Sequence, residues 1–208
     1  MTVIDASQTV FVVDDDAAVR HSLALLIRSM SLRVELFDSA AAFLDRYDES
    51  CCGCLILDIR MQGMSGMELQ QAIKQKGRGI PIIFVTGHGS VQMAVQAMRR
   101  GAVDFLEKPF DDQELLDRIN QALDIDRTSR ELQRELSSAR AKIDSLTPRE
   151  HQVMERIVNG QPNKVIAAEL ALSERTVEIH RSKVMAKTGA ASLAELVAMV
   201  TKLNSETI

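Results

Sequence analysis

Hydrophobic and polar positions follow two alternating patterns over the first 120 residues. Short and almost wholly apolar runs predict β-strands, and between them apolar residues recur every three or four positions, which is typical of one face of a helix. Val19, Leu23, Leu26 and Met30 have this helical spacing, and later segments repeat it. The predicted strands are Val10–Val13, Val34–Phe37, Cys54–Asp58, Ile80–Thr86 and Val103–Glu107.

This alternation predicts an α/β fold with a doubly wound, five-stranded parallel sheet. The strands that contain CLIL and IIFV are apolar on both sides. Such strands are expected in a sheet that helices cover on both faces, because neither side then faces water.

The pattern changes after this region, where residues 121 to 146 contain no Gly or Pro and alternate in charge. Two interpretations stay open for this segment: an exposed helical spacer, or a short coiled coil that dimerises the chain. Both rest on a heptad-like stripe, which Ser129 and Ala139 weaken: Ile125, Ser129, Leu132, Leu136, Ala139, Ile143 and Leu146.

The remaining residues contain only helical patterns. Thr147 and Glu150 form a predicted capping box with Pro148 at the first helical position. Ser173 is the expected cap of a helix over Glu174–Thr188, and the stretch from Ser192 to Glu195 predicts another capping box. Four short helices with tight turns predict an all-α helix-turn-helix domain over 146–208, after a domain over 1–122 and a helical linker over 123–145.

Length and charge agree with two small domains. The 208 residues suffice for them, and no apolar run is long enough for a membrane span. The N-terminus lacks a signal-peptide pattern, so a cytoplasmic location is the expectation. Residues 1–120 hold 12 Lys and Arg against 17 Asp and Glu, whereas residues 146–208 hold 8 against 7. The less acidic C-terminal region is compatible with an anionic partner.

The three cysteines, Cys51, Cys52 and Cys54, stand together before a buried-looking strand. A zinc or redox site would need a second pair of ligands at suitable spacing, which the sequence does not offer. We therefore predict that they are reduced and serve in packing.

Three adjacent carboxylates, Asp14, Asp15 and Asp16, end the first predicted strand. Each pair at about 4 Å repels by roughly 4 kcal/mol at an effective dielectric constant near 20. The third and fourth predicted strands end in Asp58 and Thr86, Lys108 follows the fifth, and a doubly wound sheet brings these strand ends to one edge. The carboxylates gathered there are hard oxygen ligands of the kind that Mg²⁺ prefers, so one interpretation is a bound Mg²⁺ ion. The plainer interpretation is a solvated acidic strand end with a structural salt bridge to Lys108.

The motifs VVDDD, LDIRMQGMSG, FVTGHGS and DFLEKPF, in this order and spacing, resemble the receiver domain of two-component response regulators. The stretch from LTPREHQ to KTGA is similar to the helix-turn-helix of the LuxR/FixJ class. The resemblance covers nearly the whole chain and is closest to response regulators of the FixJ type.

The resemblance implies roles for the strand-end residues. Asp58 would be the phosphoacceptor, Asp15 a direct Mg²⁺ ligand, Asp14 a ligand through water, and the Arg60 backbone carbonyl a further ligand. Thr86 would be the switch hydroxyl and Phe105 its aromatic partner. Lys108 would pair with the phosphoryl group and precede a cis peptide bond to Pro109.

Two further positions, Gln62 and Asp16, also call for interpretation. Gln62 stands where the family usually has proline, so the chain has a backbone N–H there and lacks the fixed φ angle of proline. The rigidity of the loop beside Asp58 is therefore in question. Asp16 lies outside the set of functional residues, and we interpret it as the N-cap of a helix over Ala17–Met30.

The helix over Glu174–Thr188 would enter the major groove of DNA. Basic residues there and nearby would contact phosphates, which positions a protein without specifying sequence. His180 would be a phosphate or packing contact rather than a metal ligand. The predicted DNA-contacting set is Lys164, Ser173, Arg175, Thr176, Glu178, Ile179, His180, Arg181, Ser182, Lys183 and Lys187, with Glu178, Ile179 and Ser182 facing the bases.

The chain is therefore identified as a DNA-binding response regulator rather than an enzyme. The resemblance implies a sensor histidine kinase as phosphodonor, a homodimer when phosphorylated, promoter DNA and RNA polymerase as partners, and control of transcription by activation. A Mg²⁺ phosphohydrolase would need a second acid–base carboxylate after Asp58, where Ile59 and Arg60 stand. An RNA-binding output domain would need aromatic residues to stack bases, and residues 146–208 contain none.

Overall fold

The computed structural model describes residues 8–204 with the exception of 49, 78 and 88. The chain divides into two compact units between Ser129 and Arg130. Each unit is described by itself below, and helix α5 (Asp112–Asp144) contributes residues to both.

The first unit is a five-stranded parallel sheet in the order β2-β1-β3-β4-β5, which confirms the predicted fold. Its strands are β1 (Thr9–Val13), β2 (Arg33–Phe37), β3 (Gly53–Leu57), β4 (Ile82–Thr86) and β5 (Asp104–Glu107). The connecting helices are α1 (Ala17–Ser29), α2 (Ala40–Arg46), α3 (Gly66–Gln75) and α4 (Val91–Arg99). Strand β4 begins two residues later than predicted because Pro81 has no N–H to donate to the sheet.

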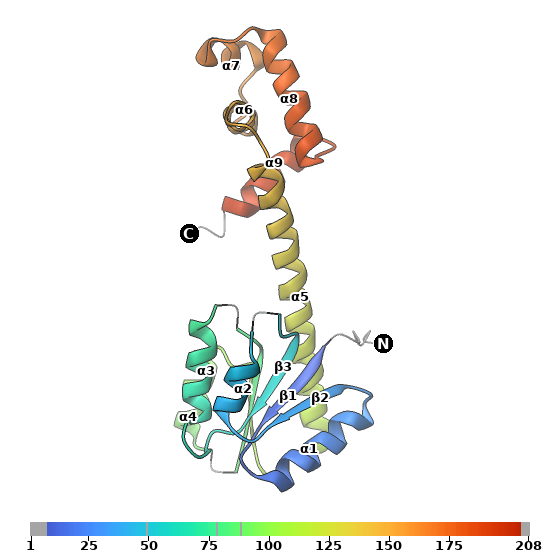
Figure 1. Ribbon diagram of the computed structural model, residues 1–208, viewed down its shortest axis with the longest axis vertical. Helices are drawn as coiled ribbons and strands as arrows, with labels where there is room; N and C mark the ends of the chain where they lie inside the picture. Colours follow the sequence, from blue (N-terminus) through green and yellow to red (C-terminus); the bar gives the residue numbers. More distant parts are fainter. Residues whose placement is uncertain (1–7, 49, 78, 88, 205–208) are drawn as a thin grey trace. The chain divides into compact units, whose positions relative to one another are not determined.

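Two hydrophobic clusters fill the two faces of the sheet. Residues of α2, α3 and α4, among them Phe43, Leu69 and Ala97, pack on one face. Residues of α1 and α5, among them Ile27 and Ile119, pack on the other, and Figure 1 shows these helices on opposite sides of the strands. Every residue of β3 and β4 is buried, as the sequence predicts. The sheet is thus a rigid support, and polar groups are gathered just beyond its strands.

Local signals in the sequence explain where several elements begin. Asp16 is the N-cap of α1, and its side chain accepts hydrogen bonds from the N–H groups of Ala18 and Val19, as predicted. Cys51 and Cys54 are buried and all three cysteines are reduced, in agreement with a packing role.

Polar contacts join the part of α5 around Leu123 and Asp126 to the sheet. Asp126 is only 1% exposed and accepts a hydrogen bond from the Gly53 N–H at 2.8 Å, while Gln8 donates to the Leu123 carbonyl at 2.7 Å. Gly53 has a φ of +133°, and a Cβ atom there would lie 1.8 Å from the Thr9 carbonyl oxygen. Only glycine therefore fits at the beginning of β3.

The second unit combines the rest of α5 with α6 (Pro148–Val158), α7 (Asn163–Leu170), α8 (Glu174–Thr188) and α9 (Leu193–Asn204). Val153, Ile166, Val177 and Leu196 lie at the centre of its core. Among the described residues no single helix is long and apolar enough to cross a membrane, although α8 and α9, bent by 63° from each other, meet the length and composition criteria together.

The two predicted capping boxes differ. Thr147 and Glu150 form the complete box, with Pro148 at its predicted place. At the start of α9 only half is formed: Ser192 accepts from the Glu195 N–H, whereas the Glu195 carboxylate accepts from the Ala191 N–H at 2.7 Å. The prediction of a complete second box was wrong, because this carboxylate satisfies a donor one residue before Ser192.

The heptad-like stripe on α5 is partly used inside the second unit. Leu136 is 4% exposed, Leu146 belongs to the core, and Ile143 packs against that core. In contrast, Ile125 and Leu132 are each 43% exposed. This burial favours the spacer interpretation over a coiled coil, because a coiled coil would need the whole stripe for a partner.

Candidate functional site

Polar residues gather at the carboxyl edge of the parallel sheet. Asp14 follows β1, Asp58 follows β3, Thr86 ends β4, and Lys108 follows β5. Because these strands are consecutive neighbours in the sheet, their ends lie side by side. Backbone hydrogen bonds continue the sheet into the site, from the Asp58 N–H to the Val13 carbonyl at 2.9 Å and from the Lys108 N–H to the Thr86 carbonyl at 2.9 Å.

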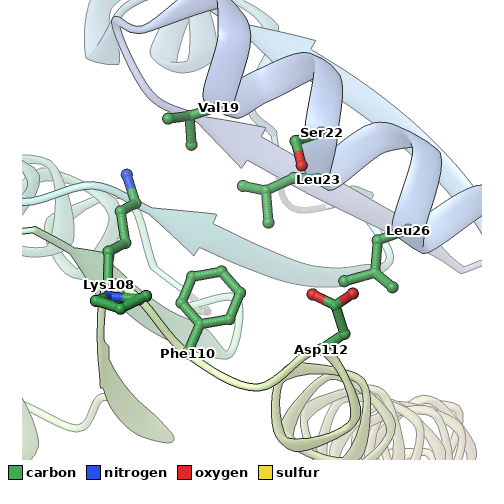
Figure 2. Close-up of a pocket in the computed structure, with 8 residues that line it drawn as sticks. Val19, Ser22, Leu23, Leu26, Lys108, Phe110 and Asp112 are labelled. Atoms are coloured by element: carbon green, nitrogen blue, oxygen red, sulfur yellow. The ribbon is translucent and has the colours of Figure 1, made fainter.

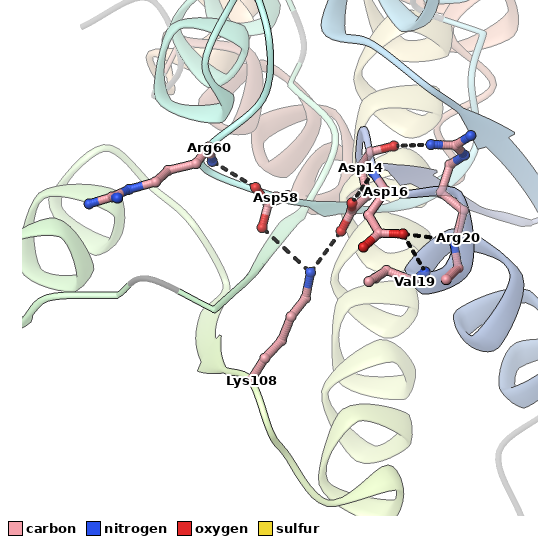
Figure 3. A network of polar contacts seen from close by, with 8 residues as sticks. Asp14, Asp16, Val19, Arg20, Asp58, Arg60 and Lys108 are labelled. Atoms are coloured by element: carbon pink, nitrogen blue, oxygen red, sulfur yellow. Dashed lines mark hydrogen bonds and ion pairs between the residues drawn. The ribbon is translucent and has the colours of Figure 1, made fainter.

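The Lys108 ammonium lies between two covered carboxylates, as Figure 3 shows. Its Nζ is 2.8 Å from Asp14 Oδ2 and 3.6 Å from Asp58 Oδ1. Asp14 is 3% exposed and Asp58 is 7% exposed. The structure therefore brings these three predicted site residues together, with one cation for two anions.

The surroundings of Asp58 disfavour its negative charge. Burial raises the pKa of its carboxyl group above the usual value, Lys108 opposes that rise, and the Asp14 carboxylate adds to it. The Arg60 N–H donates to Asp58 Oδ2 at 2.7 Å and fixes the orientation of the carboxylate. Its other oxygen, Oδ1, faces Lys108 and is the atom suited to act as a nucleophile.

Asp15 is exposed and has a different environment. Its Oδ2 accepts a hydrogen bond from the Gln62 backbone N–H at 3.2 Å. In the part of the chain that the structure describes, no three His, Cys, Asp or Glu side chains converge as a metal-binding group. In this arrangement the Lys108 ammonium lies between Asp14 and Asp58 and neutralises part of their charge.

The oxygen donors nevertheless fit Mg²⁺. This ion takes only one or two carboxylates and keeps several water molecules. The carboxylates of Asp15 and Asp58 together with the Arg60 carbonyl are a hard oxygen set of the kind it prefers. The resemblance to receiver domains implies Mg²⁺ binding at this edge of the sheet.

Thr86 and Phe105 lie on the neighbouring strands β4 and β5. Thr86 is buried, and Phe105 is half-buried against the core under α2, α3 and α4. Sequence reasoning missed Gly89, where a Cβ atom would lie 3.0 Å from the Phe105 ring and 3.6 Å from the Thr86 methyl group. The small residues of FVTGHGS were the available signal. The peptide bond between Lys108 and Pro109 is cis, as predicted.

A groove borders the site on the side of α1, as Figure 2 shows. Helix α1 contributes Val19, Leu23 and Leu26, and the loop after β5 contributes Phe110 together with Lys108. The groove is largely apolar, and Lys108 lies at its margin. The periodicity of α1 predicts a buried apolar face. It could not show that part of this face lines a groove instead of being fully covered by the core.

In the second unit, α8 follows a tight turn in which Ala171 adopts the left-handed conformation, with a φ of 54°. Val177 and Val184 point into the core. The exposed members of the predicted DNA-contacting set are Lys164, Ser173, Arg175, Glu178, Ile179, Ser182, Lys183 and Lys187.

Some members of that set also make local contacts. Ser173 caps α8, and its hydroxyl lies 2.8 Å from that of Thr176. His180 and Arg181 are half-buried, and His180 Nδ1 is covered without a hydrogen-bond partner among the described residues. This burial favours the packing role of His180 over the predicted alternative of a phosphate contact.

Lys187 has two partners within its own unit. Its Nζ lies 2.7 Å from Glu150 Oε2 and 3.2 Å from the Ser145 carbonyl oxygen. The hydrogen bond from Lys187 and that from the Thr147 N–H lower the pKa of Glu150 to about 2. Glu150 was predicted only as a capping residue, and its ion pair gives Lys187 a structural role in addition to the predicted contact with DNA.

Comparison with known proteins agrees with this architecture. Residues 10–120 match the family of response regulator receiver domains, and residues 144–200 match the bacterial regulatory proteins of the luxR family. The response regulator protein TodT of Pseudomonas putida is 43% identical over 96% of this chain and 88% of its own length. The transcriptional regulatory protein FixJ of Bradyrhizobium diazoefficiens is 45% identical over 90% of this chain and 92% of its own.

Among solved structures, that of the response regulator StyR is similar, with a TM-score of 0.87, 46% identity and coverage of 94% of this chain and 98% of that one. Of these relatives, FixJ is named as a transcriptional regulatory protein, and TodT and StyR as response regulators. This chain therefore belongs to the response regulators that join a receiver domain to a DNA-binding domain of the luxR family.

Proposed function

We propose that Asp58 accepts a phosphoryl group from a sensor histidine kinase and that the modified protein dimerises and binds promoter DNA. The observation that carries the proposal is the Lys108 ammonium, 2.8 Å from Asp14 and 3.6 Å from Asp58. A cation shared by two covered carboxylates is suited to meet the extra negative charge of a transferred phosphoryl group.

The transfer needs no reactant other than Asp58 and the phosphohistidine of the donor. Asp58 Oδ1 attacks the phosphorus atom of a phosphohistidine, the new O–P bond forms as the N–P bond breaks, and the imidazole of the donor leaves with the electron pair. The Arg60 N–H holds the other oxygen of Asp58 throughout. Lys108 then pairs with an oxygen of the phosphoryl group.

Mg²⁺ would be held by the carboxylates of Asp15 and Asp58 and by the Arg60 carbonyl, with Asp14 acting through water. When bound, it would neutralise charge on the phosphoryl oxygens. The groove beside Lys108 offers a largely apolar surface next to the site, on which the kinase could dock.

Dimerisation would follow from a change near Thr86 and Phe105. The phosphoryl group adds close to two negative charges and three acceptor oxygens, and Thr86 would donate to one of them. Helix α4 next to these strands has an exposed apolar stripe, with Val91 81%, Val95 45% and Met98 44% exposed. A second receiver could cover this stripe, which would join two DNA-binding units on one promoter.

On DNA, the exposed side of α8 would lie in the major groove, with Glu178, Ile179 and Ser182 toward the bases. The basic residues of the predicted set would contact phosphates. Activation through RNA polymerase completes the proposal, since a dimer fixed at a promoter can present a second surface to the polymerase.

Phosphorylation of the full chain tests the proposal. The wild type, incubated with a small phosphodonor and Mg²⁺, should gain one phosphoryl group in an intact-mass measurement. Asp58→Asn should gain none, whereas Asp45→Asn, which changes an exposed carboxylate on α2, should behave as the wild type. A phosphoryl group on the Asp58→Asn variant would refute the assignment, and turnover of a phosphomonoester would favour an enzyme.

Sedimentation with and without beryllofluoride tests the dimer. Val95→Asp should keep the protein monomeric in both conditions. The control Leu25→Asp, which changes an exposed side chain on α1, should leave the dimer intact. A wild-type dimer in both conditions, or a monomer in both, would contradict dimerisation driven by phosphorylation.

DNA binding by the wild type and by two variants of α8 completes the test. Affinity for any duplex should fall steeply with salt as phosphate contacts release counterions. Arg181→Ala should weaken binding to all sequences, and Ser182→Ala should change the preference at a few bases.

A further inference from the structure

The backbone of Gln62 makes a contact that proline cannot make. Its N–H donates to Asp15 Oδ2 at 3.2 Å and joins the loop after β3 to the loop after β1, 47 residues apart in the chain. Proline, the usual residue of the family at this position, has no N–H. The side chain of Gln62 is exposed, so the functional group at this position is the main-chain N–H.

The same loop holds two carboxylates in the same way. The Arg60 N–H donates to Asp58 Oδ2 at 2.7 Å, and two residues later the Gln62 N–H donates to Asp15 Oδ2. In each carboxylate one oxygen is thus bound by the loop, and Oδ1 is left for a cation or a phosphoryl group. The Arg60 carbonyl, the third proposed oxygen ligand, lies on the loop between these two donors.

Asp15 needs such a contact more than its neighbours do. Asp14 is covered and paired with Lys108, and Asp16 is committed to capping α1. Asp15 is exposed, and repulsion from the adjacent carboxylates favours rotation of its side chain away from the site. A hydrogen bond to a fixed donor opposes that rotation.

The loop itself is anchored well enough to serve as a fixed donor. The Gly66 N–H donates to the Ile59 carbonyl at 3.0 Å. A Cβ atom at Gly66 would lie 2.2 Å from the Asp58 carbonyl oxygen, so the two ends of the loop are in close contact. These contacts restrain the loop at a place where the family usually relies on the fixed φ of proline.

We infer that the Gln62 backbone N–H is a positioning group for Mg²⁺: it holds Asp15 with Oδ1 toward the ion and so raises the affinity of the receiver for the metal. This inference rests on the proposed role of Asp15 as a ligand. The apparent affinity of a site falls with the fraction of molecules in the binding-competent arrangement, so loss of the N–H should weaken Mg²⁺ binding by about threefold to tenfold.

The test is a titration of the full-length chain with Mg²⁺ alone, followed through the amide NMR signals of the loop. Gln62→Ala keeps the N–H and should bind Mg²⁺ as the wild type does. Gln62→lactate differs from Gln62→Ala only by an ester oxygen in place of the N–H, and it should bind Mg²⁺ about threefold to tenfold more weakly. Gln62→Pro should show the same loss, and the lactate variant keeps the test valid if proline disturbs the loop.

The outcomes separate the inference from the function on which it rests. Equal affinities for the alanine and lactate variants would overturn the inference, and so would an equal loss in both, because the side chain would then be responsible. Asp15→Asn examines the ligand itself. If that variant binds Mg²⁺ as the wild type does, the proposed metal site is wrong, whatever the Gln62 variants show.

Discussion

Two ion pairs of almost the same length have different surroundings in the two units. Lys108 lies 2.8 Å from Asp14 in the receiver, and Lys187 lies 2.7 Å from Glu150 in the DNA-binding unit. Both carboxylates are 3% exposed. Neither the distance nor the burial distinguishes the pair in the candidate site from the pair that supports a fold.

The difference lies in what surrounds each pair. Lys187 faces one carboxylate, and Glu150 also accepts a hydrogen bond from the Thr147 N–H at 2.8 Å, so its pKa falls to about 2. Lys108 faces two carboxylates, and burial raises the pKa of the second, Asp58. A satisfied anion stabilises a structure, whereas an incompletely neutralised one is poised to bind a cation or to react.

The largest effect is expected from breaking the satisfied pair. Lys187→Met should leave Glu150 covered and without its cation, and should lower the melting temperature of the DNA-binding unit by several degrees. Hydrogen exchange in α6 and α8 of the full chain would report the loss locally. Lys183→Met, which removes an exposed cation from the same helix, should weaken DNA binding without this loss of protection.

Acid should remove the contribution of the same pair. The pKa of Glu150 is lowered in the folded chain, so its contribution is fully present above the ordinary value of 4.5 and disappears as the pH falls from there through about 2. The difference in stability between the wild type and Glu150→Gln should therefore shrink over this range. A difference that stays constant with pH would show that Glu150 stabilises the unit by packing rather than by charge.

The opposite sign is expected at Asp58. Because folding raises the pKa of this carboxyl group, its ionised form is less favourable in the folded chain than in the unfolded one, and its charge costs stability at neutral pH. Asp58→Asn should raise the melting temperature of the receiver by a few degrees in a chelating buffer. Added Mg²⁺ should reduce that gain, since the cation offsets the charge only in the wild type. A destabilised Asp58→Asn variant would contradict the assignment of a poised carboxylate.

Much of this architecture could be predicted from the sequence, because periodicity and strand ends are local signals. The alternation of apolar runs predicts the sheet, and the rule that parallel strands end at one edge predicts the meeting of Asp14, Asp58 and Lys108. Pro148 and Ser173 mark the starts of α6 and α8 through their local chemistry.

Contacts between distant segments could not be predicted in this way. The bond from Gln62 to Asp15 and the pair of Lys187 with Glu150 depend on how loops and helices pack, which no local pattern encodes. The stripe on α5 is a related case. Its spacing permits a coiled coil, and only the burial of Leu136 and Leu146 shows that the chain uses part of it internally.

The smallest effect is expected from a third ion pair, which separates distance from environment. Lys202 Nζ lies 2.6 Å from Glu135 Oε2 in the DNA-binding unit, closer than in either pair above. The two side chains are 47% and 66% exposed, so water and salt screen their attraction. Glu135→Gln should therefore change the free energy of unfolding by at most about 0.5 kcal/mol, and less at high salt.

Chemical denaturation of the full chain at low and high salt would measure this change in the free energy of unfolding, with Glu150→Gln as the covered counterpart. A loss at Glu135 as large as that at Glu150 would mean that proximity alone decides the strength of these pairs, and the contrast between a satisfied and a poised carboxylate would lose its physical basis.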